Sequence, residues 1–385
     1  MNEVYNLTGY TLVCFSHLRW NFVYQRPQHL MSRCSKLCRV FYIEEPIFSN
    51  ESDRYQLNVQ DNVGIVTPIL NDEANEKNTA VRINDLLKDL FQYQSINKYL
   101  FWYYTPMALS FTESFDPELI IYDCMDELSA FRFAPAELKE LEKEMFRRAD
   151  LVLTGGQNLY EHKKDWHHNI YPLPSSIDRE HFARARSFDT DPADQREVRH
   201  PRFGYYGVID ERFDVDLIDT VAAEKPDWYF IFIGPVVKID PSSLPNHSNI
   251  CYLGSKKYEE LPGYLAGWDI ALIPFVRNQY TEFISPTKTP EYLAAGKPVI
   301  STSIKDVVSP YGINGLVKIA DSPDEFIHAA DSILSEGTGE HWLRDVDNFL
   351  SVNSWDKTWT RVLELMKMAM HEENKLSTLK KRHYV

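Results

Sequence analysis

Short apolar runs alternate with stretches of helical spacing along most of the chain. Runs typical of buried strands occur in the first half at 11–15, 40–43, 99–103, 119–122 and 151–154. The second half repeats the style at 202–206, 228–233, 250–253, 270–273 and 298–301, with a short candidate at 316–319. Amphipathic patterns lie between these runs, for example at 133–148. Strands that alternate with helices predict parallel sheets covered by helices, which is an α/β fold.

The two halves are separated by a polar, charged stretch at 186–201 that contains proline and is typical of a linker. We therefore expect two Rossmann-like, doubly wound domains, at 1–185 and 200–340, and 385 residues suffice for both. Residues 341–385 predict terminal helices that pack back toward the first domain and end in a basic tail. In such domains ligands bind at the carboxyl ends of the strands, so the cleft between the domains is the expected site.

Composition narrows the function and the compartment. The net charge of -15 argues against binding to nucleic acid, which requires a basic surface. No apolar run reaches 18 residues, and the first residues lack the pattern of a signal peptide. The five cysteines are scattered, as expected for reduced thiols. We expect a cytoplasmic protein with at most peripheral contact at the inner membrane face.

The stretch Ser-Pro-Thr-Lys-Thr-Pro-Glu-Tyr-Leu-Ala-Ala-Gly-Lys-Pro at 285–298 predicts a helix with signals at both ends. Its two Ser/Thr-Pro pairs each offer an N-cap followed by proline, and Gly296 and Pro298 would end it. Lys288 and Glu291 then lie near the start of the helix, where free N–H groups and the helix dipole favour an anion.

These two residues suggest a ligand that is anionic at one end and rich in hydroxyls at the other. Lys288 adds a full positive charge, whereas Glu291 would repel phosphate and suits hydroxyl groups. A diphosphate beside a sugar ring is a nucleotide sugar. Spacing alone also allows a capped surface helix whose Lys and Glu are solvated.

The same stretch resembles the donor-binding helix of GT-B glycosyltransferases, the group that includes glycogen synthases and bacterial polysaccharide transferases. The resemblance implies that Lys288, with Thr287 beside it, contacts the diphosphate and that Glu291 holds the ribose hydroxyls. It also implies a GT-B fold, in which two Rossmann-like domains face a central cleft. Many relatives carry another Glu eight residues before the ribose Glu, and here that position is Phe283, with Glu282 one residue off.

A second segment, Tyr-Gly-Val-Ile-Asp-Glu-Arg at 206–212, follows the first predicted strand of the second half. Gly207 would let the backbone approach a phosphate, and Arg212 offers a forked donor suited to a diphosphate. A structural ion pair is the alternative for Arg212. In the resembling transferases a Glu-Lys pair here touches the diphosphate, and Glu211-Arg212 would be that pair. Gly234 and Gly254 match further strand-end glycines of that fold.

Polar residues also follow strands of the first half. Asp123 and Asp126 could act as a general base or bind an acceptor, although Asp126 could instead cap a helix. The loop after the first strand carries a His and an Arg, and the second strand ends in two Glu residues. The predicted catalytic residues are His17, Asp123 and Asp126, and the predicted acceptor-binding residues are Arg19, Glu44 and Glu45.

Together with Arg-Pro-Gln-His-Leu at 26–30, these motifs also resemble a bacterial subgroup of polysaccharide or teichuronic-acid-type transferases. The resemblance implies a glycosyltransferase that moves a sugar from a nucleotide-diphosphate donor to a glycan or lipid-linked glycan acceptor, with retention as the usual outcome. It implies no metal or other cofactor, and Asp214-Val215-Asp216 has the spacing of a metal motif but is expected to begin a helix. A nucleotide-sugar 2-epimerase of the same fold, or a non-catalytic protein that binds sugar nucleotides or glycans, are the alternatives.

Overall fold

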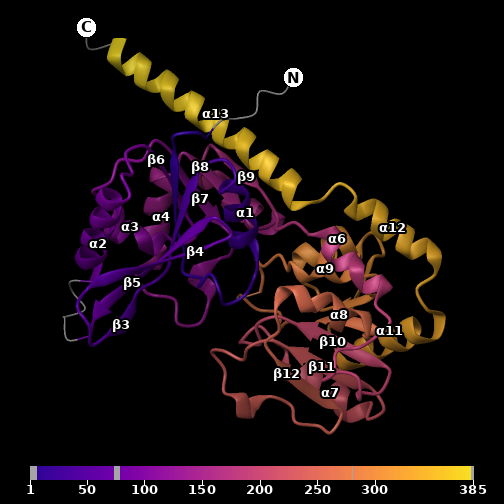
Figure 1. Ribbon diagram of the computed structural model, residues 1–385. Helices are drawn as coiled ribbons and strands as arrows, with labels where there is room; N and C mark the ends of the chain where they lie inside the picture. The colour runs from indigo at the N-terminus through magenta and orange to yellow at the C-terminus, as the bar shows by residue number, and fades with distance from the viewer. Residues whose placement is uncertain (1–6, 73–78, 280, 383–385) are drawn as a thin grey trace.

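The computed structural model describes residues 7–72, 79–279 and 281–382, and it consists of two lobes, each built on one largely or wholly parallel sheet (Figure 1). The side chains of Glu340 and of residues 372–382 lie outside the description, and so do the charged side chains of the basic tail predicted from the sequence. Two helix-covered sheets confirm the expected α/β, GT-B architecture.

The first sheet has the strand order β3-β5-β2-β1-β6-β7-β8-β9, and β4 pairs with β5 as its antiparallel member. All the strand runs expected in the first half are present, and the region 47–71 adds a further group that the apolar pattern did not predict. The strands are β1 (Thr11–Phe15), β2 (Arg39–Ile43), β3 (Ile47–Ser49), β4 (Arg54–Gln60), β5 (Val63–Asn71), β6 (Tyr99–Tyr103), β7 (Ile120–Cys124), β8 (Leu151–Thr154) and β9 (Ile170–Pro172).

Alternate residues of these strands enter two cores, one on each face of the sheet. Leu12 and Cys14 pack on one face with α1 (Arg26–Cys34), whereas Val13 and Phe15 pack on the other with α2 (Thr79–Tyr93) and α4 (Leu138–Arg148). The helix α4 is shorter than the predicted 133–148. The short helices α3 (Leu109–Thr112) and α5 (Gln157–Lys163) complete this lobe.

The second sheet is wholly parallel, with the order β12-β11-β10-β13-β14-β15. Its strands are β10 (Arg202–Tyr206), β11 (Tyr229–Ile233), β12 (Ile250–Gly254), β13 (Ile270–Ile273), β14 (Val299–Ser301) and β15 (Val317–Ile319). The helices around it are α6 (Arg179–Ala183), α7 (Val215–Glu224), α8 (Leu261–Ala266), α9 (Lys288–Ala294), α10 (Lys305–Val307), α11 (Pro323–Glu336) and α12 (Glu340–Leu350). The segment 214–216 begins α7, as expected, with Asp214 as its N-cap.

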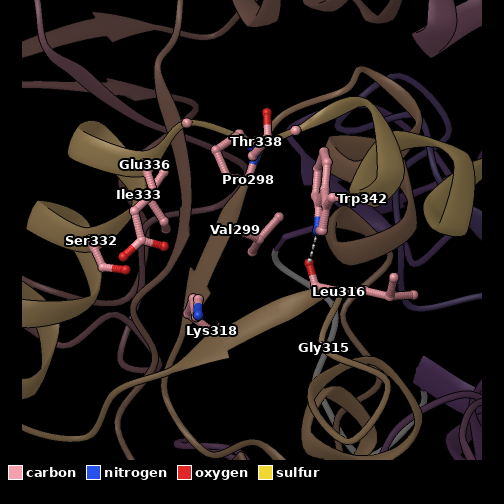
Figure 2. A pocket seen from close by; sticks show the side chains of 12 residues that line it. Pro298, Val299, Gly315, Leu316, Lys318, Ser332, Ile333, Glu336, Thr338 and Trp342 are labelled. Carbon is pink, nitrogen blue, oxygen red and sulfur yellow. Dashed lines mark hydrogen bonds between the residues drawn. The ribbon is translucent and has the colours of Figure 1, made fainter.

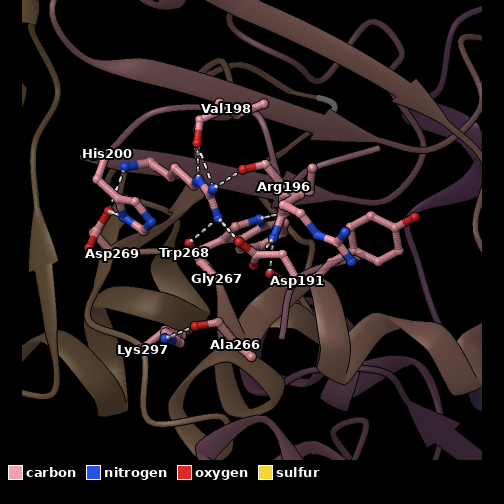
Figure 3. A network of polar contacts seen from close by, with 12 residues as sticks. Asp191, Arg196, Val198, His200, Ala266, Gly267, Trp268, Asp269 and Lys297 are labelled. Carbon is pink, nitrogen blue, oxygen red and sulfur yellow. Dashed lines mark hydrogen bonds and ion pairs between the residues drawn. The ribbon is translucent and has the colours of Figure 1, made fainter. Parts of the chain in front are cut away.

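A buried arginine, Arg202, ties the polar segment before β10 to the second lobe; Figure 3 labels its partners Asp191 and Gly267. The guanidinium of Arg202 donates to the Asp191 carboxylate at 2.7 Å and to the carbonyl oxygen of Gly267 at 3.3 Å. Nearby, His200 Nδ1 lies 2.6 Å from the carboxylate of Asp269. These bonds fix the path of the chain as it enters β10, the strand that leads into the site described below.

The chain returns to the first lobe at its end. The long helix α13 (Trp355–Arg382) runs along that lobe (Figure 1), and Trp355, Trp359 and Val362 are buried in the core that contains Leu12. Within the described residues, none of the helices has the length and apolar character needed to cross a membrane.

In each sheet the strand order reverses beside the strand that comes first in the chain. In the first sheet β1 lies between β2 and β6, and in the second β10 lies between β11 and β13. Ligands of doubly wound sheets bind at the carboxyl ends of the strands beside such a switch point. The loops after β1, β7, β10 and β13 are therefore where a site is expected, and they carry most of the predicted residues.

Candidate active site

Lys288 lies directly against the backbone that follows β10. A Cβ placed on Gly207 would lie 2.2 Å from Lys288 Cε and 2.7 Å from its Nζ, so a larger residue would displace the amine. Behind it, a Cβ on Gly234 would lie 1.9 Å from the carbonyl oxygen of Gly207. Both glycines have φ of +139°, which other residues rarely adopt. These glycines therefore set the position of the amine at the switch point. Gly254 joins the same edge, since its carbonyl accepts from Gly234 N at 2.9 Å.

Arg212 is held at the same edge by its own loop. Its guanidinium bonds the carboxylate of Asp210 through two nitrogens, at 2.9 and 2.7 Å, and its backbone N–H donates to the same carboxylate at 3.0 Å. The guanidinium carbon lies 5.6 Å from the ring centre of Phe131 in the first domain and 6.0 Å from that of Phe275. The predicted alternative of an ion pair is thus present, and it fixes the guanidinium at the cleft.

Lys288 is the first residue of α9, so neither predicted Ser/Thr-Pro pair starts this helix. Thr287 precedes it and makes no capping bond through its side chain. Burial lowers the pKa of Lys288, and the charge of Arg212 acts in the same direction. A cation whose pKa is depressed in this way is poorly solvated and gains from an incoming anion.

Glu291 is next to Lys288 and is held by a residue that the sequence did not single out. The hydroxyl of Tyr206 donates to its carboxylate. Burial raises the pKa of Glu291, while Tyr206 and Lys288 oppose the shift. The backbone N–H of Tyr206 in turn donates to the Tyr292 hydroxyl at 3.0 Å, so α9 is attached to the end of β10.

Asp126 of the first domain faces these cations across the cleft. Burial raises the pKa of Asp126 to about 6, and the positive charges of Arg212, Arg26 and Lys288 oppose this rise. Two of those three cations belong to the second domain. A carboxylate close to the cations and ionised near neutral pH is suited to accept a proton.

Asp123 lies in a different environment, although it is three residues from Asp126. Its carboxylate is fully buried and accepts a hydrogen bond from Arg26 Nε at 2.9 Å. The Arg26 side chain is only 1% exposed. Arg26 also donates to the carbonyl oxygen of Leu173 at 2.7 Å. Because a buried charge needs its partner, this pair anchors α1 beneath the cleft.

His17 follows β1 at the other switch point. Burial, with a contribution from the charge of Lys238, lowers the pKa of His17 to about 4. The ring is therefore neutral at physiological pH. Among the described residues, its Nδ1 has no hydrogen-bond partner.

The three predicted acceptor-binding residues, Arg19, Glu44 and Glu45, lie together and bond mainly to one another. Arg19 Nη1 lies 3.2 Å from the Glu44 carboxylate, and the guanidinium also donates to the carbonyl oxygens of Glu45 and Pro46. Glu44 further accepts from the backbone N–H of Trp20 at 2.8 Å. These bonds shape the loops after β1 and β2.

The two domains touch at the other end of the cleft. Both carboxylate oxygens of Asp306 accept backbone N–H groups at the start of α5, from Gln157 and Asn158, each at 3.0 Å. Phe283, which occupies the position of the expected Glu, packs on His162 of the first domain with ring centres 4.6 Å apart. The segment before Lys288 is thus attached to the first domain.

Two cavities accompany this arrangement. One of about 290 Å³ lies among Arg277, Asn278, Ser303 and Lys305, in the loops that follow β13 and β14. The other, of about 170 Å³, lies where β14 and β15 begin, beside Trp342 (Figure 2). This cavity is at the opposite edge of the sheet from Lys288.

Within the described ranges no group of three or more His, Cys, Asp or Glu side chains could hold a metal ion.

Sequence reasoning missed several residues of this site. Asp210 was adjacent to a predicted residue, and its spacing of two from Arg212 was the available signal. Tyr206, Phe131 and Lys238 gave no local signal, because their contacts join segments that are distant in the chain.

Comparisons with known proteins agree with this geometry. Residues 205–336, which include Gly207, Arg212, Lys288 and Glu291, match the family described as glycosyl transferases group 1. The chain is 24% identical over 293 residues to TuaH of Bacillus subtilis (strain 168), named as a proposed teichuronic acid biosynthesis glycosyltransferase, covering 70% of this chain and 72% of that protein.

Solved structures share the fold at low sequence identity. A trehalose-6-phosphate structure from E. coli, bound with UDP-2-fluoro glucose, matches with a TM-score of 0.69 at 12% identity, over 93% of this chain and 99% of that chain. Alr3699/HepE from Anabaena, in complex with UDP and glucose, matches with a TM-score of 0.67 at 12% identity, over 92% and 99%.

Proposed function

We propose that the chain is a GT-B glycosyltransferase that transfers a sugar from a nucleoside-diphosphate donor to a hydroxyl group of a glycan. Its residues 205–336 match glycosyl transferases group 1, and its two sheets have the architecture expected for that fold. Lys288 and Arg212 bind the diphosphate, with Gly207, Gly234, Gly254 and Thr287 giving its oxygens access to the backbone. Glu291 binds the ribose hydroxyls. The structures with bound UDP-2-fluoro glucose and with UDP and glucose support a donor of this class.

The observation that carries the proposal is the approach of Lys288 to Gly207. The amine lies where no Cβ fits, is desolvated, and is next to a second fixed cation, Arg212. Arg212 is paired with Asp210, but burial and the charge of Arg212 still lower the pKa of Lys288, so the amine gains from a further anion. A diphosphate supplies that anion. The part of the ligand next to Glu291 must carry hydroxyl groups, because the carboxylate would repel phosphate.

In the reaction, an acceptor hydroxyl oxygen bonds the anomeric carbon while the bond from that carbon to the diphosphate oxygen breaks. The leaving diphosphate keeps the electron pair, and Lys288 and Arg212 stabilise the charge that develops on it. Asp126 accepts the hydroxyl proton. Because Asp126 lies within the field of the cations that bind the leaving group, the acceptor enters on the side of the leaving group. This geometry supports retention at the anomeric carbon.

The remaining predicted residues support these steps. Asp123 positions α1 and the loop that carries Asp126 through its bond to Arg26. His17 contacts substrate beside them, and Arg19, Glu44 and Glu45 form the outer wall for the acceptor. Similarity to TuaH supports an acceptor in polysaccharide or cell-surface glycan synthesis, such as a lipid-linked glycan. We place the reaction in the cytoplasm, with at most peripheral membrane contact.

A thermal-shift panel of UDP, GDP, ADP and dTDP with their common sugars tests the donor site, since a ligand raises stability by RT ln(1 + [L]/Kd). We expect one nucleoside diphosphate and its sugar to stabilise the protein. Product analysis with the stabilising donor then identifies the activity. Release of nucleoside diphosphate that accelerates with glycan acceptors supports transfer, whereas an isomerised nucleotide sugar identifies a 2-epimerase. Binding without turnover identifies a non-catalytic protein.

A further inference from the structure

Lys238, which follows β11, lies beside side chains of both domains. Lys238 Nζ lies 3.9 Å from Glu211 Oε1 of its own domain and 5.3 Å from the ring centre of Phe131 in the first domain. Its charge also acts on His17, at the end of β1. Lys238 therefore connects the loops after β1, β7, β10 and β11, at the point where the two domains face each other.

Two of these side chains have buried polar atoms that lack a hydrogen-bond partner among the described residues. The Glu211 side chain is 8% exposed, and in the part of the chain that the structure describes neither of its oxygens has a hydrogen-bond partner. The same holds for His17 Nδ1. A buried acceptor left unsatisfied costs about 1–3 kcal/mol, so such groups are rare unless a ligand completes them. Two such groups close to one cation point to a ligand-binding site.

The chemistry of the cluster identifies the ligand class. Glu211 and neutral His17 can each accept a hydrogen bond, Lys238 can donate, and Phe131 offers an aromatic face. An anion is disfavoured, because it would lie against the carboxylate of Glu211. An apolar group would leave the buried acceptors unpaired. A neutral sugar ring has hydroxyl donors, hydroxyl acceptors and a C–H face, and it satisfies all four side chains.

We propose that Glu211, Lys238, His17 and Phe131 form the acceptor subsite, and that it binds a neutral pyranose ring. Ring hydroxyls donate to Glu211 and His17 and accept from Lys238, and the ring packs on Phe131. This inference rests on the proposed function, because it places the acceptor next to the leaving group. The link is Phe131, whose ring centre is 5.6 Å from the guanidinium of Arg212.

The Lys238 side chain is 44% exposed and lies beside the enclosed Glu211. Its long, flexible stem can move aside as a sugar enters, after which the amine binds a hydroxyl. The site thus opens at Lys238 without movement of the sheets, and its residues come from both domains. A subsite of this kind is complete only when the domains face each other as they do here.

The test uses saturation-transfer difference NMR on the full chain. The probes are the methyl pyranosides of glucose, galactose, mannose and N-acetylglucosamine, with methyl glucuronoside as the charged comparison. Each is titrated with and without the nucleoside diphosphate that stabilises the protein. The variants are Glu211→Gln and Phe131→Leu, and the matched control is Glu224→Gln at the exposed end of α7.

We expect wild type and Glu224→Gln to bind at least one neutral pyranoside and to bind the glucuronoside more weakly. Glu211→Gln should weaken that pyranoside about 10-fold or more, the range of a lost charge-assisted bond. Phe131→Leu should weaken it several-fold. Both variants should melt within a few degrees of wild type.

The subsite is refuted if wild type binds none of the neutral pyranosides, or if Glu211→Gln binds them as wild type does. It is also refuted if the glucuronoside binds best. Failure of the donor site gives a different result, namely no stabilisation by any nucleoside diphosphate. Because the pyranosides are also titrated alone, the two failures are distinguished.

Discussion

Replacing Lys288 with Met separates a donor-binding role from a structural one, because the two roles predict opposite changes. Met keeps an unbranched stem of similar length beside Gly207 and the Tyr205 ring, whose centre is 5.7 Å from the amine. It removes the ammonium group, with its charge and its hydrogen-bond donors. If the amine binds a diphosphate, the loss equals a charge-assisted hydrogen bond, about 1.5–3 kcal/mol, which is about 10- to 150-fold in Kd.

Stability should change in the other direction. The pKa of Lys288 is depressed in the folded state, mainly by burial, so the unfolded chain binds this proton more tightly. The charge of Lys288 therefore lowers the free energy of unfolding at neutral pH. This destabilisation decreases as the pH rises toward 10.5, the ordinary pKa of lysine. Lys288→Met lacks this destabilisation. Glu291, left without its cation, keeps the Tyr206 hydroxyl and a raised pKa, so it can take up a proton at little cost.

The assays are calorimetric titration of the stabilising nucleoside diphosphate and thermal unfolding at neutral pH. Lys225→Met is the matched control, since Lys225 pairs with Asp331 at the far end of α7. We expect the control to bind as wild type does, and Lys288→Met to bind weakly while melting at the same temperature or higher. Unchanged affinity would remove Lys288 from the donor site. A clear fall in melting temperature with a matching loss of affinity would show that Lys288 acts as a structural ion pair.

Three further predictions follow from the same contacts. Glu291→Gln should weaken a nucleoside diphosphate but leave inorganic pyrophosphate unaffected in calorimetry, and equal losses would assign Glu291 to support of α9. Asp126→Asn should slow transfer by about 10²–10⁴-fold and abolish the rise in rate as pH increases through about 6, where Asp126 ionises. Because folding raises the pKa of Asp126 above its ordinary value of 3.8, ionisation of this carboxyl lowers the stability of the wild type as the pH rises. The Asn variant should therefore unfold at a higher temperature than wild type at pH 8 but not at pH 4. A transfer rate within about twofold of wild type would exclude Asp126 as the base. Gly156→Ala should separate the domains, because its Cβ would lie 2.1 Å from the Asp306 carboxylate that caps α5, and an unchanged radius of gyration in small-angle scattering would contradict this.

The sequence alone determined the elements and their order. Buried parallel strands are continuous apolar runs, so β1, β6, β8, β10 and β13 were predicted at their observed bounds. Lys288 and Glu291 were placed on one helix because their relation depends only on a spacing of three. The start of α9 was less certain, since both Ser/Thr-Pro pairs were compatible with local rules and tertiary packing placed the first turn between them. The strands β3 and β4 were missed because they are largely exposed and lack an apolar run, whereas β5 is buried and apolar and was missed although its run is visible in the sequence.

Only the tertiary structure decided what the charged residues do. Asp123 and Asp126 look alike in the sequence, yet a partner 97 positions away makes one a buried ion pair, while the other faces cations of the second domain. Arg19 and Glu44 both looked available for an acceptor, but they bond each other. Lys238 showed no motif of its own, and Glu211 was expected to act with Arg212 but lies beside Lys238. The pairing and solvation of a charged side chain depend on which distant segments pack against it. Local sequence patterns do not show which distant segments will do so.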